Sequence, residues 1–334
     1  MAGTIRWGIL GTGGIAKKFA EGLQSVSDAE LAAVGSRADH TAESFAEAFG
    51  IGHRHASYES LANDPDVDVV YVATPHPFHM ENTLLCLNAG KAVLCEKPFA
   101  INASQAQKMI ETAKEKKLFL MEAMWTRFLP IIAKVRQWLE DEVIGEVRMV
   151  QANFGFRADW LPERRWLNPQ LGGGALLDVG VYCISLASMI FRQPPQKIVS
   201  MAHLGQTGVD EQSAFIFSYD KGQLSVLTSA ISTNTENHAI ISGTKGSIKI
   251  HSPFWCATIA TLSIEGKDNK TVEMPLEGNG YNYQAEEVMN CMRAGKTQSK
   301  IMPLDETLSI MKTMDSIRKQ WALEYPMEET DKTE

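Results

Sequence analysis

Cysteine is scarce and scattered in this chain of 334 residues. The five cysteines are odd in number, and no pair has the CxxC spacing of a zinc site or a redox centre. We therefore expect reduced core cysteines in a cytoplasmic protein and assign none of them to catalysis. An HExxH motif and a Cys/His cluster at ligand spacing are also missing, so we expect no catalytic metal.

Positive charge is in deficit, since 32 Lys and Arg face 40 Asp and Glu, for a formal charge of -8 at pH 7. This balance, without any basic run, argues against nucleic acid as a partner. We also find no stretch that approaches the ~20 apolar residues of a membrane helix, and we expect no membrane partner. The apolar part of the first ten residues is too short for a signal peptide and is typical of a strand.

A hydrophobic fraction of 44% over this length predicts a globular protein of two domains. The first ~120 residues alternate strand and helix patterns, as a parallel sheet with crossover helices does. We assign residues 1–123 to a Rossmann dinucleotide-binding domain of the α/β class. Its expected strands are residues 5–10, 31–35, 67–73, 92–95 and 118–122, and its expected helices are residues 15–26, 41–49, 80–89 and 104–116.

The pattern changes after about Trp125, where strands joined by short loops predominate. We assign residues 124–334 to an α+β substrate-binding and dimerisation domain with a large, mostly antiparallel open sheet and helices on one face. One face of such a sheet stays open, which favours a homodimer formed through it. The expected strands are residues 148–156, 197–203, 213–219, 223–232, 238–242, 247–251 and 258–264, and the expected helices are residues 130–139, 175–191, 284–294 and 304–321.

A glycine-rich motif follows the first expected strand and opens the first helix. In GxGxxA the first glycine permits a tight turn, the second lets the backbone approach a pyrophosphate, and the small last residue packs helix on strand. Free amides at the helix start then hold phosphates. The predicted cofactor contacts here are Gly11, Thr12, Gly13, Gly14, Ile15 and Ala16.

Cofactor choice is predicted from the end of the second strand, where an enzyme that prefers NAD carries an acidic residue for the ribose hydroxyl. Ser36 and Arg37 stand there instead, and a guanidinium suits a phosphate. They favour NADP over NAD. In the alternative, Arg37 is a solvated loop charge, and Asp39, which we expect to cap the next helix, contacts the ribose.

Two further segments follow strands of the first domain, at the edge where open α/β sheets bind ligands. One holds Thr74, Pro75, His76 and His79, and the other is Glu96-Lys97-Pro98. A lysine beside a nicotinamide site can donate a proton or polarise a carbonyl. In the alternative, Lys97 is a surface charge and the histidines make local loop bonds.

Together these motifs resemble the glucose-fructose oxidoreductase (Gfo/Idh/MocA) family. The resemblance rests on the GxGxxA turn, on Glu96-Lys97-Pro98, and on a GG...D-x-G segment from Gly172 to Tyr182, and it weakens after about Gly266. Tyr182 stands where the family usually has histidine, which is similar to the dimeric dihydrodiol dehydrogenase and NADP D-xylose dehydrogenase branch. The resemblance implies dimers through the second domain, NADP-dependent oxidation of trans-dihydrodiols or sugars, and cofactor contacts that include Trp125 and Arg127.

The resemblance also places Lys97 and Tyr182 at the reacting carbon, with Trp125, Phe154 and Trp255 around an apolar substrate pocket. A neutral tyrosine is a poor base near pH 7, but an adjacent ammonium favours its phenolate. Lys97 could supply that charge, so that the pair takes the hydroxyl proton. Asp178 lies four residues before Tyr182, on the same helix face, and would hold the substrate or Tyr182. Ordinary core packing is the alternative for the aromatic residues.

Three functions stay open at this point. The first is an NADP-dependent dehydrogenase for a polyol, sugar or trans-dihydrodiol. The second is a reductase of a sugar-derived ketone such as anhydrofructose. The third is a noncatalytic NADP-sensing regulator of the same fold, against which the intact Glu96-Lys97-Pro98 unit and Tyr182 argue.

Overall fold

A computed structural model describes residues 3–328 of the chain, as two compact units. The first unit consists of residues 3–125 together with Glu277–Leu308. The second consists of Thr126–Leu276 together with residues 309–328. Each unit has its own sheet, so each is described by itself.

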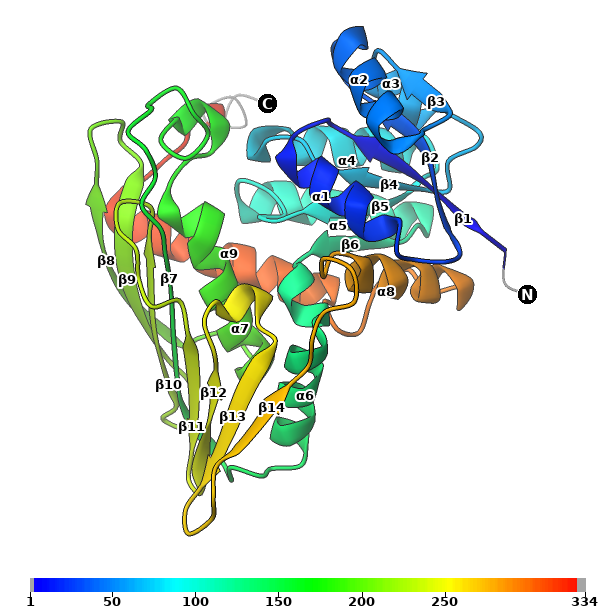
Figure 1. Cartoon of the computed structure of the whole chain (residues 1–334). Coiled ribbons are helices and arrows are strands. Elements are labelled where there is room, and N and C mark those ends of the chain that lie inside the picture. Colours follow the sequence, from blue (N-terminus) through cyan, green and yellow to red (C-terminus); the bar gives the residue numbers. More distant parts are fainter. Residues whose placement is uncertain (1–2, 329–334) are drawn as a thin grey trace. The chain divides into compact units, whose positions relative to one another are not determined.

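The sheet of the first unit has six strands in the order β3-β2-β1-β4-β5-β6, all parallel where they pair (Figure 1). This is a Rossmann sheet, which confirms the predicted class of the first domain. The strands are β1 (Ile5–Leu10), β2 (Ala29–Gly35), β3 (His53–His55), β4 (Val69–Val72), β5 (Ala92–Glu96) and β6 (Leu120–Ala123). The helices are α1 (Gly14–Leu23), α2 (Asp39–Phe49), α3 (Tyr58–Ala62), α4 (His79–Asn88) and α5 (Ala103–Lys116), and α8 (Asn282–Arg293) joins them from later in the chain.

Local sequence patterns explain most of the strands and helices of the first unit. All residues of β4 and β5 are buried, as the continuous apolar runs predict for parallel strands covered on both faces. Helix α2 ends at Gly50, whose φ of 69° is the left-handed cap expected there. The expected cap by Asp39 is wrong, because Ala38 is the N-cap and Asp39 is the first residue of the helix, with no side-chain cap bond. Strand β3 and helix α3 were not predicted, since three and five residues are too short to show a period.

Residues 277–308 belong to the first unit, whereas the division predicted from the sequence assigns them to the second domain. Long-range contacts account for this placement. The Tyr281 ring stacks on Trp125 with centroids 4.5 Å apart, and the Leu120 amide donates to the Thr297 carbonyl at 3.1 Å. Arg293 forms an ion pair with Asp28 at 2.5 Å. Such pairings between distant segments have no local signature in the sequence.

The second unit is built on an eight-stranded sheet in the order β14-β13-β12-β11-β7-β10-β9-β8. Its pairs are antiparallel except β7 with β10, so the predicted, mostly antiparallel sheet is confirmed. The strands are β7 (Val147–Gly155), β8 (Lys197–Leu204), β9 (Asp210–Ser218), β10 (Leu224–Ala230), β11 (Ala239–Gly243), β12 (Gly246–Ile250), β13 (Ile259–Ile264) and the unpredicted β14 (Lys270–Glu273). The long helices are α6 (Pro130–Glu140), α7 (Val181–Phe191) and α9 (Leu304–Trp321).

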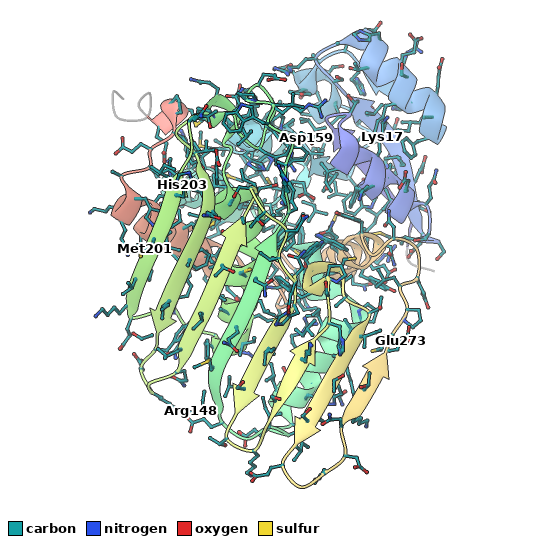
Figure 2. The ribbon with its side chains drawn as sticks, turned by 60° about the vertical axis from the view of Figure 1, so that its left-hand side comes forward. Lys17, Arg148, Asp159, Met201, His203 and Glu273 are labelled. Carbon is teal, nitrogen blue, oxygen red and sulfur yellow. The ribbon has the colours of Figure 1, made fainter. Side chains whose placement is uncertain are left out.

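The two faces of this sheet differ in burial. Along β9, Ser213, Phe215 and Phe217 point into the core, while the alternate residues Ala214 and Ile216 are exposed. Helix α7 packs on the inner side of β7 and β10. Figure 2 views the opposite face, from which Met201 and His203 of β8 project. Val199, Met201 and Ile216 are 53%, 77% and 46% exposed there, an apolar surface that no described residue covers.

One helical stretch within residues 3–328, Pro169–Phe191, is long and apolar enough to pass as a membrane span. The expectation that no stretch of the chain approaches the length of a membrane helix is therefore wrong. In the structure 83% of its most apolar window is buried, as in the core helix of a globular domain.

Candidate functional site

The turn between β1 and α1 has the geometry that a dinucleotide needs. Gly11 has φ of 108°, and a Cβ there would lie 2.9 Å from the carbonyl oxygen of Ala73, so only glycine fits. At Gly13 and Gly14 an added Cβ would meet nothing within 4 Å, which leaves the backbone open to a ligand. Gly13 caps α1 without a side-chain bond, and Ala16 is fully buried against the sheet. The chain's own residues thus fit the pyrophosphate of a dinucleotide.

Ser36 and Arg37 follow β2 at the same edge of the sheet. The Ser36 hydroxyl lies 2.6 Å from that of Thr41, and its amide donates to the His55 carbonyl at 3.1 Å. Arg37 is exposed, with its guanidinium carbon 5.6 Å from the centre of the Phe78 ring. Arg37 therefore has an exposed side chain whose guanidinium lies beside the Phe78 ring.

The strand order reverses between β1 and β4, which is the point where open α/β sheets bind their ligands. Gly11 follows β1, and Thr74 follows β4. Lys97 is the first residue after β5, the neighbour of β4. The topology therefore brings the phosphate turn, Thr74 and Lys97 to one edge of one sheet.

His79 is fully buried and connects two of these loops. Its Nδ1 lies 2.8 Å from the Pro98 carbonyl oxygen, and its Nε2 lies 2.8 Å from that of Thr74. Burial lowers the pKa of His79 to about 4, although both carbonyls oppose this shift. A neutral imidazole has one N–H and so donates to one of these two carbonyl oxygens. With no exposed ring and a backbone carbonyl beside each nitrogen, His79 is placed to hold the loops and not to exchange protons with a substrate.

The Glu96 side chain connects strand β4 to the backbone of Lys97. The Glu96 side chain is 4% exposed, and its Oε1 accepts a hydrogen bond from the Tyr71 hydroxyl. Its Oε2 accepts from the backbone amide of Lys97 at 3.1 Å. The Lys97-Pro98 peptide is cis, and the Lys97 side chain is half-buried. The Glu96 carboxylate therefore holds the backbone at Lys97.

Trp125 and Arg127 both make packing contacts. Trp125 is 6% exposed and stacks on Tyr281 in the first unit. Arg127 is 3% exposed in the second unit, where it donates to the Ser185 hydroxyl at 3.0 Å and to the Ser185 carbonyl at 2.7 Å. Ser185 lies on α7, so Arg127 braces the helix that carries Tyr182. The sequence did not indicate these hydrogen bonds between Arg127 and Ser185.

In the second unit the expected helix over residues 175–191 begins as a π-helical turn, Leu176–Gly180, before α7. Such turns occur often at functional sites. The approach to it needs Gly174, whose φ is 116° and whose Cβ would lie 2.2 Å from Asp210 Oδ1. Asp210 Oδ2 accepts from the Leu176 amide at 2.7 Å. A buried carboxylate therefore anchors the start of the segment that carries Asp178.

Asp178 has a partner that sequence reasoning missed. The Asp178 side chain is 6% exposed, and its Oδ1 accepts from Arg165 at 2.9 Å. Arg165 is half-exposed and also lies over the Trp166 ring, 5.3 Å from its centre. No motif marks Arg165, because it comes from a loop 13 residues earlier in the chain. The ion pair fixes the Asp178 carboxylate in place, as a group that orients hydroxyl groups must be.

Tyr182 lies in an aromatic cluster with the other residues predicted for the substrate pocket of this unit. Phe154 stacks on Trp255 with centroids 3.4 Å apart and planes within 4°. The Tyr182 ring centroid lies 5.4 Å from that of Phe154. Tyr182 and Phe154 are each 7% exposed, and Trp255 is half-buried. The structure thus brings Phe154, Tyr182 and Trp255 together, whereas Trp125 packs in the first unit.

Two family models match the chain, one within each unit. Residues 5–124 match the family described as "Oxidoreductase family, NAD-binding Rossmann fold". Residues 132–249 match the family described as "GFO/IDH/MocA C-terminal domain". The two matches together cover more than half of the chain.

Curated relatives match over nearly the full length. Trans-1,2-dihydrobenzene-1,2-diol dehydrogenase of Xenopus tropicalis is 38% identical, with 96% of this chain and 99% of the relative covered. The enzyme of the same name from Mus musculus is 39% identical, with 97% and 99% covered.

Two solved structures have the same fold at 25% identity, each with 95% of this chain and 97% of the other covered. One is the aldose-aldose oxidoreductase of Caulobacter crescentus complexed with glycerol, at a TM-score of 0.87. The other is a 3-ketoreductase from Actinomadura kijaniata in complex with NADP and TDP-benzene, at a TM-score of 0.84.

Proposed function

The chain belongs to the Gfo/Idh/MocA family of NAD(P)-binding oxidoreductases, and we propose that it is an NADP-dependent dehydrogenase acting on a secondary hydroxyl of a polyol, sugar or trans-dihydrodiol. The observation that supports this most is the placement of Lys97. It follows β5 at the edge where the Gly11 turn follows β1, and a buried carboxylate and a buried histidine fix its loop. A lysine anchored in this way beside a dinucleotide turn has a chemical role that a solvated lysine lacks.

The cofactor would be held by this chain's turn and by the end of β2. The residues from Gly11 to Ala16 offer amides to the pyrophosphate, and Ser36 with Arg37 offer a hydroxyl and a guanidinium to a 2'-phosphate. The remaining proposed cofactor contacts at this edge of the sheet are Thr74, Pro75, His76 and Glu96. When bound, the nicotinamide takes or returns the hydride.

The acid-base work falls to Tyr182 and Lys97. We assign to the Tyr182 phenolate the removal of the substrate's hydroxyl proton during oxidation, which leaves the Tyr182 hydroxyl, and to that hydroxyl the return of the proton during reduction. The Lys97 ammonium stabilises the phenolate that starts oxidation and that reduction regenerates. Asp178, fixed by Arg165, accepts hydrogen bonds from substrate hydroxyls and so orients the reacting carbon.

The aromatic cluster favours a substrate with an apolar face. Phe154 and Trp255 form a flat stacked pair beside Tyr182, which suits the ring of a dihydrodiol or the apolar face of a pyranose. The names of the curated relatives support the dihydrodiol. The aldose-aldose oxidoreductase and the 3-ketoreductase support a sugar, and with it the second candidate, reduction of a sugar-derived ketone.

Turnover assays test this proposal. Purified protein is offered NADP with D-xylose, other aldoses and trans-1,2-dihydrobenzene-1,2-diol, and NADPH with anhydrofructose and related ketones. We expect saturable NADP reduction with at least one hydroxyl substrate. NADP binding without turnover on any member of either panel would favour the noncatalytic regulator.

A homodimer through the open face of the eight-stranded sheet is part of the proposal. The exposed apolar residues of β8 and β9 support it, because a contiguous exposed apolar surface marks an interaction site. A cytoplasmic location is supported by the cysteines, since Cys86, Cys95, Cys183, Cys256 and Cys291 are all free thiols.

A further inference from the structure

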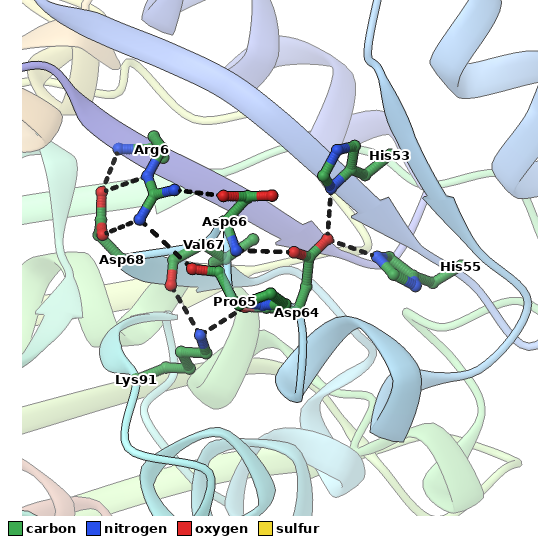
Figure 3. Close-up of polar contacts among 9 residues, drawn as sticks. All are labelled: Arg6, His53, His55, Asp64, Pro65, Asp66, Val67, Asp68 and Lys91. Atoms are coloured by element: carbon green, nitrogen blue, oxygen red, sulfur yellow. Dashed lines mark hydrogen bonds and ion pairs between the residues drawn. The ribbon is translucent and has the colours of Figure 1, made fainter.

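His53, His55 and Asp64 meet beside the edge strand of the first unit, outside the proposed cofactor and catalytic residues (Figure 3). His53 Nδ1 and His55 Nε2 each lie 2.8 Å from the same oxygen, Asp64 Oδ2. The three potential ligand atoms lie within 4.8 Å of one another. No catalytic metal was expected from the sequence, and the His-x-His spacing of His53 and His55 was not recognised.

The fold makes these side chains converge. His53 and His55 are alternate residues of β3, so both point to the same face of the strand. Asp64 lies in the turn that connects α3 to β4. Lys91 Nζ donates to the backbone carbonyls of Asp64 and Val67, the latter at 2.8 Å, and so holds this turn in place. The ligand set is therefore arranged by backbone that other contacts fix.

Outer contacts orient two of the three side chains. His55 Nδ1 lies 2.7 Å from the Ser60 hydroxyl, which leaves Nε2 aimed at Asp64. Asp64 Oδ1 accepts from the Asp66 amide at 2.8 Å, which leaves Oδ2 aimed at both rings. Metal-binding histidines nearly always have such a partner on the second ring nitrogen, and ligating carboxylates are also hydrogen-bonded. The cluster has this outer shell already in place.

We propose that His53, His55 and Asp64 form a binding site for a divalent transition-metal ion, with Zn²⁺ as the preferred ion. Two imidazole nitrogens and one carboxylate oxygen are a set that zinc accepts at about 2.0 to 2.2 Å, with a fourth position for water. Donors around a tetrahedral zinc lie roughly 3.3 Å apart, so the two 2.8 Å contacts need to open by about half an ångström. The ion replaces the hydrogen bonds by which Asp64 joins the two rings.

Access and charge agree with a cation here. The His53 side chain is 45% exposed, whereas Asp64 is 3% exposed, so an ion would enter from the His53 side. His53 lines a surface hollow of about 530 Å³ with Glu30, Asp66 and Arg6. Arg6 forms ion pairs with Asp66 at 2.6 Å and Asp68 at 2.9 Å, and Glu30 adds a further negative charge. Lys91 directs its ammonium to carbonyl oxygens and not to the ligand carboxylate.

A bound ion would tie a short edge strand to the turn before β4. Strand β3 has three residues and pairs only with β2 among the described strands. The His55 carbonyl accepts the Ser36 amide, so the same tie restrains the segment before Arg37. The ion would thus be structural, and the proposal does not depend on hydride transfer.

Zinc titration of the full-length protein tests the site. Protein freed of metal with a chelator is titrated with Zn²⁺ by calorimetry, without any nucleotide. We expect one equivalent per chain, bound with a dissociation constant of micromolar or lower, and a higher melting temperature when Zn²⁺ is in excess. His55→Gln and Asp64→Asn should each weaken binding by tenfold or more and remove the thermal shift.

Two further variants keep the test independent of folding. His53→Gln changes a half-exposed side chain and should weaken zinc binding without lowering the melting temperature of the metal-free protein. His40→Gln removes an exposed histidine of α2 in the same unit and should leave binding unchanged. No binding to wild type, or equal binding to wild type, His53→Gln and Asp64→Asn, would overturn the proposal.

Discussion

Asp210 Oδ2 accepts a hydrogen bond from the backbone amide of Leu176 at 2.7 Å, at the start of the helix that carries Asp178 and Tyr182. The carboxyl group is fully buried, and Oδ1 has no hydrogen-bond partner within residues 3–328. Burial raises the pKa of Asp210 from 3.8 to about 7, against the opposing effect of the Leu176 amide. The helix with the candidate catalytic residues is therefore anchored by a group that titrates near neutral pH.

Asp210→Asn tests this anchor. Because the pKa is higher in the folded state, Asp210 favours folding most at low pH, and this contribution is lost as pH rises from ~4 through ~7. Asparagine keeps an oxygen for the Leu176 amide but does not ionise. We expect the melting temperature of the variant, relative to wild type, to rise between about pH 4 and pH 7. Asp159→Asn changes an exposed residue of the same unit and serves as the control, so its melting temperature should change with pH in parallel with that of wild type. The same parallel dependence for Asp210→Asn would contradict a raised pKa of Asp210 in the folded protein.

Arg37→Ala should change cofactor preference. Loss of an ionic hydrogen bond to the 2'-phosphate costs roughly 1.5 to 3 kcal/mol. The Michaelis constant for NADP should rise tenfold or more, while that for NAD stays nearly constant. Steady-state kinetics with both cofactors measures this. Equal losses would show that Arg37 does not read the 2'-phosphate.

The His79→Ala variant tests whether His79 holds the Thr74 and Pro98 loops together or transfers a proton. The neutral ring donates to one of the buried carbonyls of Thr74 and Pro98, and removal of the ring leaves that carbonyl without its donor, at a cost of ~1 to 3 kcal/mol. We expect a clear fall in melting temperature together with the loss of turnover. If turnover fell a hundredfold with an unchanged melting temperature and fold, His79 would be the base.

Met201→Glu tests the dimer. A charge on the exposed apolar face of β8 should be costly to bury, so the variant should be monomeric where wild type is dimeric at micromolar concentration. Sedimentation or light scattering gives the mass. Ser104→Glu adds the same charge at an exposed position of α5 and should leave the dimer intact. A monomeric wild type would refute the interface.

The sequence predicted elements whose signals are local. The glycine turn after β1, the buried runs of β4 and β5, and the alternation of β9 each follow from short-range chemistry, and the resemblance placed Lys97 and Tyr182 in known motifs. Strand β3 was missed because three polar residues, His53-Arg54-His55, show no apolar alternation.

Contacts between segments far apart in the chain could not be predicted from the sequence. Arg165 with Asp178, Asp210 with Leu176, and Asp64 with both histidines join segments whose neighbourhood only the fold decides. The placement of residues 277–308 in the first unit has the same origin. A buried aspartate such as Asp210 differs from a surface one only by its surroundings, which composition and period do not encode.

Lys97 and Tyr182 are proposed to act as one unit on the reacting hydroxyl. A double-mutant cycle with Tyr182→Phe and Lys97→Met tests it most directly, with turnover number and NADP affinity measured for all four proteins. NADP affinity by fluorescence titration shows whether the cofactor site is intact in Tyr182→Phe. Melting temperatures show whether each variant is folded.

We expect each single variant to lose a hundredfold or more in turnover, and the double variant to be little worse than either, because residues that act together are not additive. NADP affinity of Tyr182→Phe should stay near that of wild type. Additive losses in the double variant would show independent roles, and near-normal turnover of Tyr182→Phe would contradict the assignment of the base.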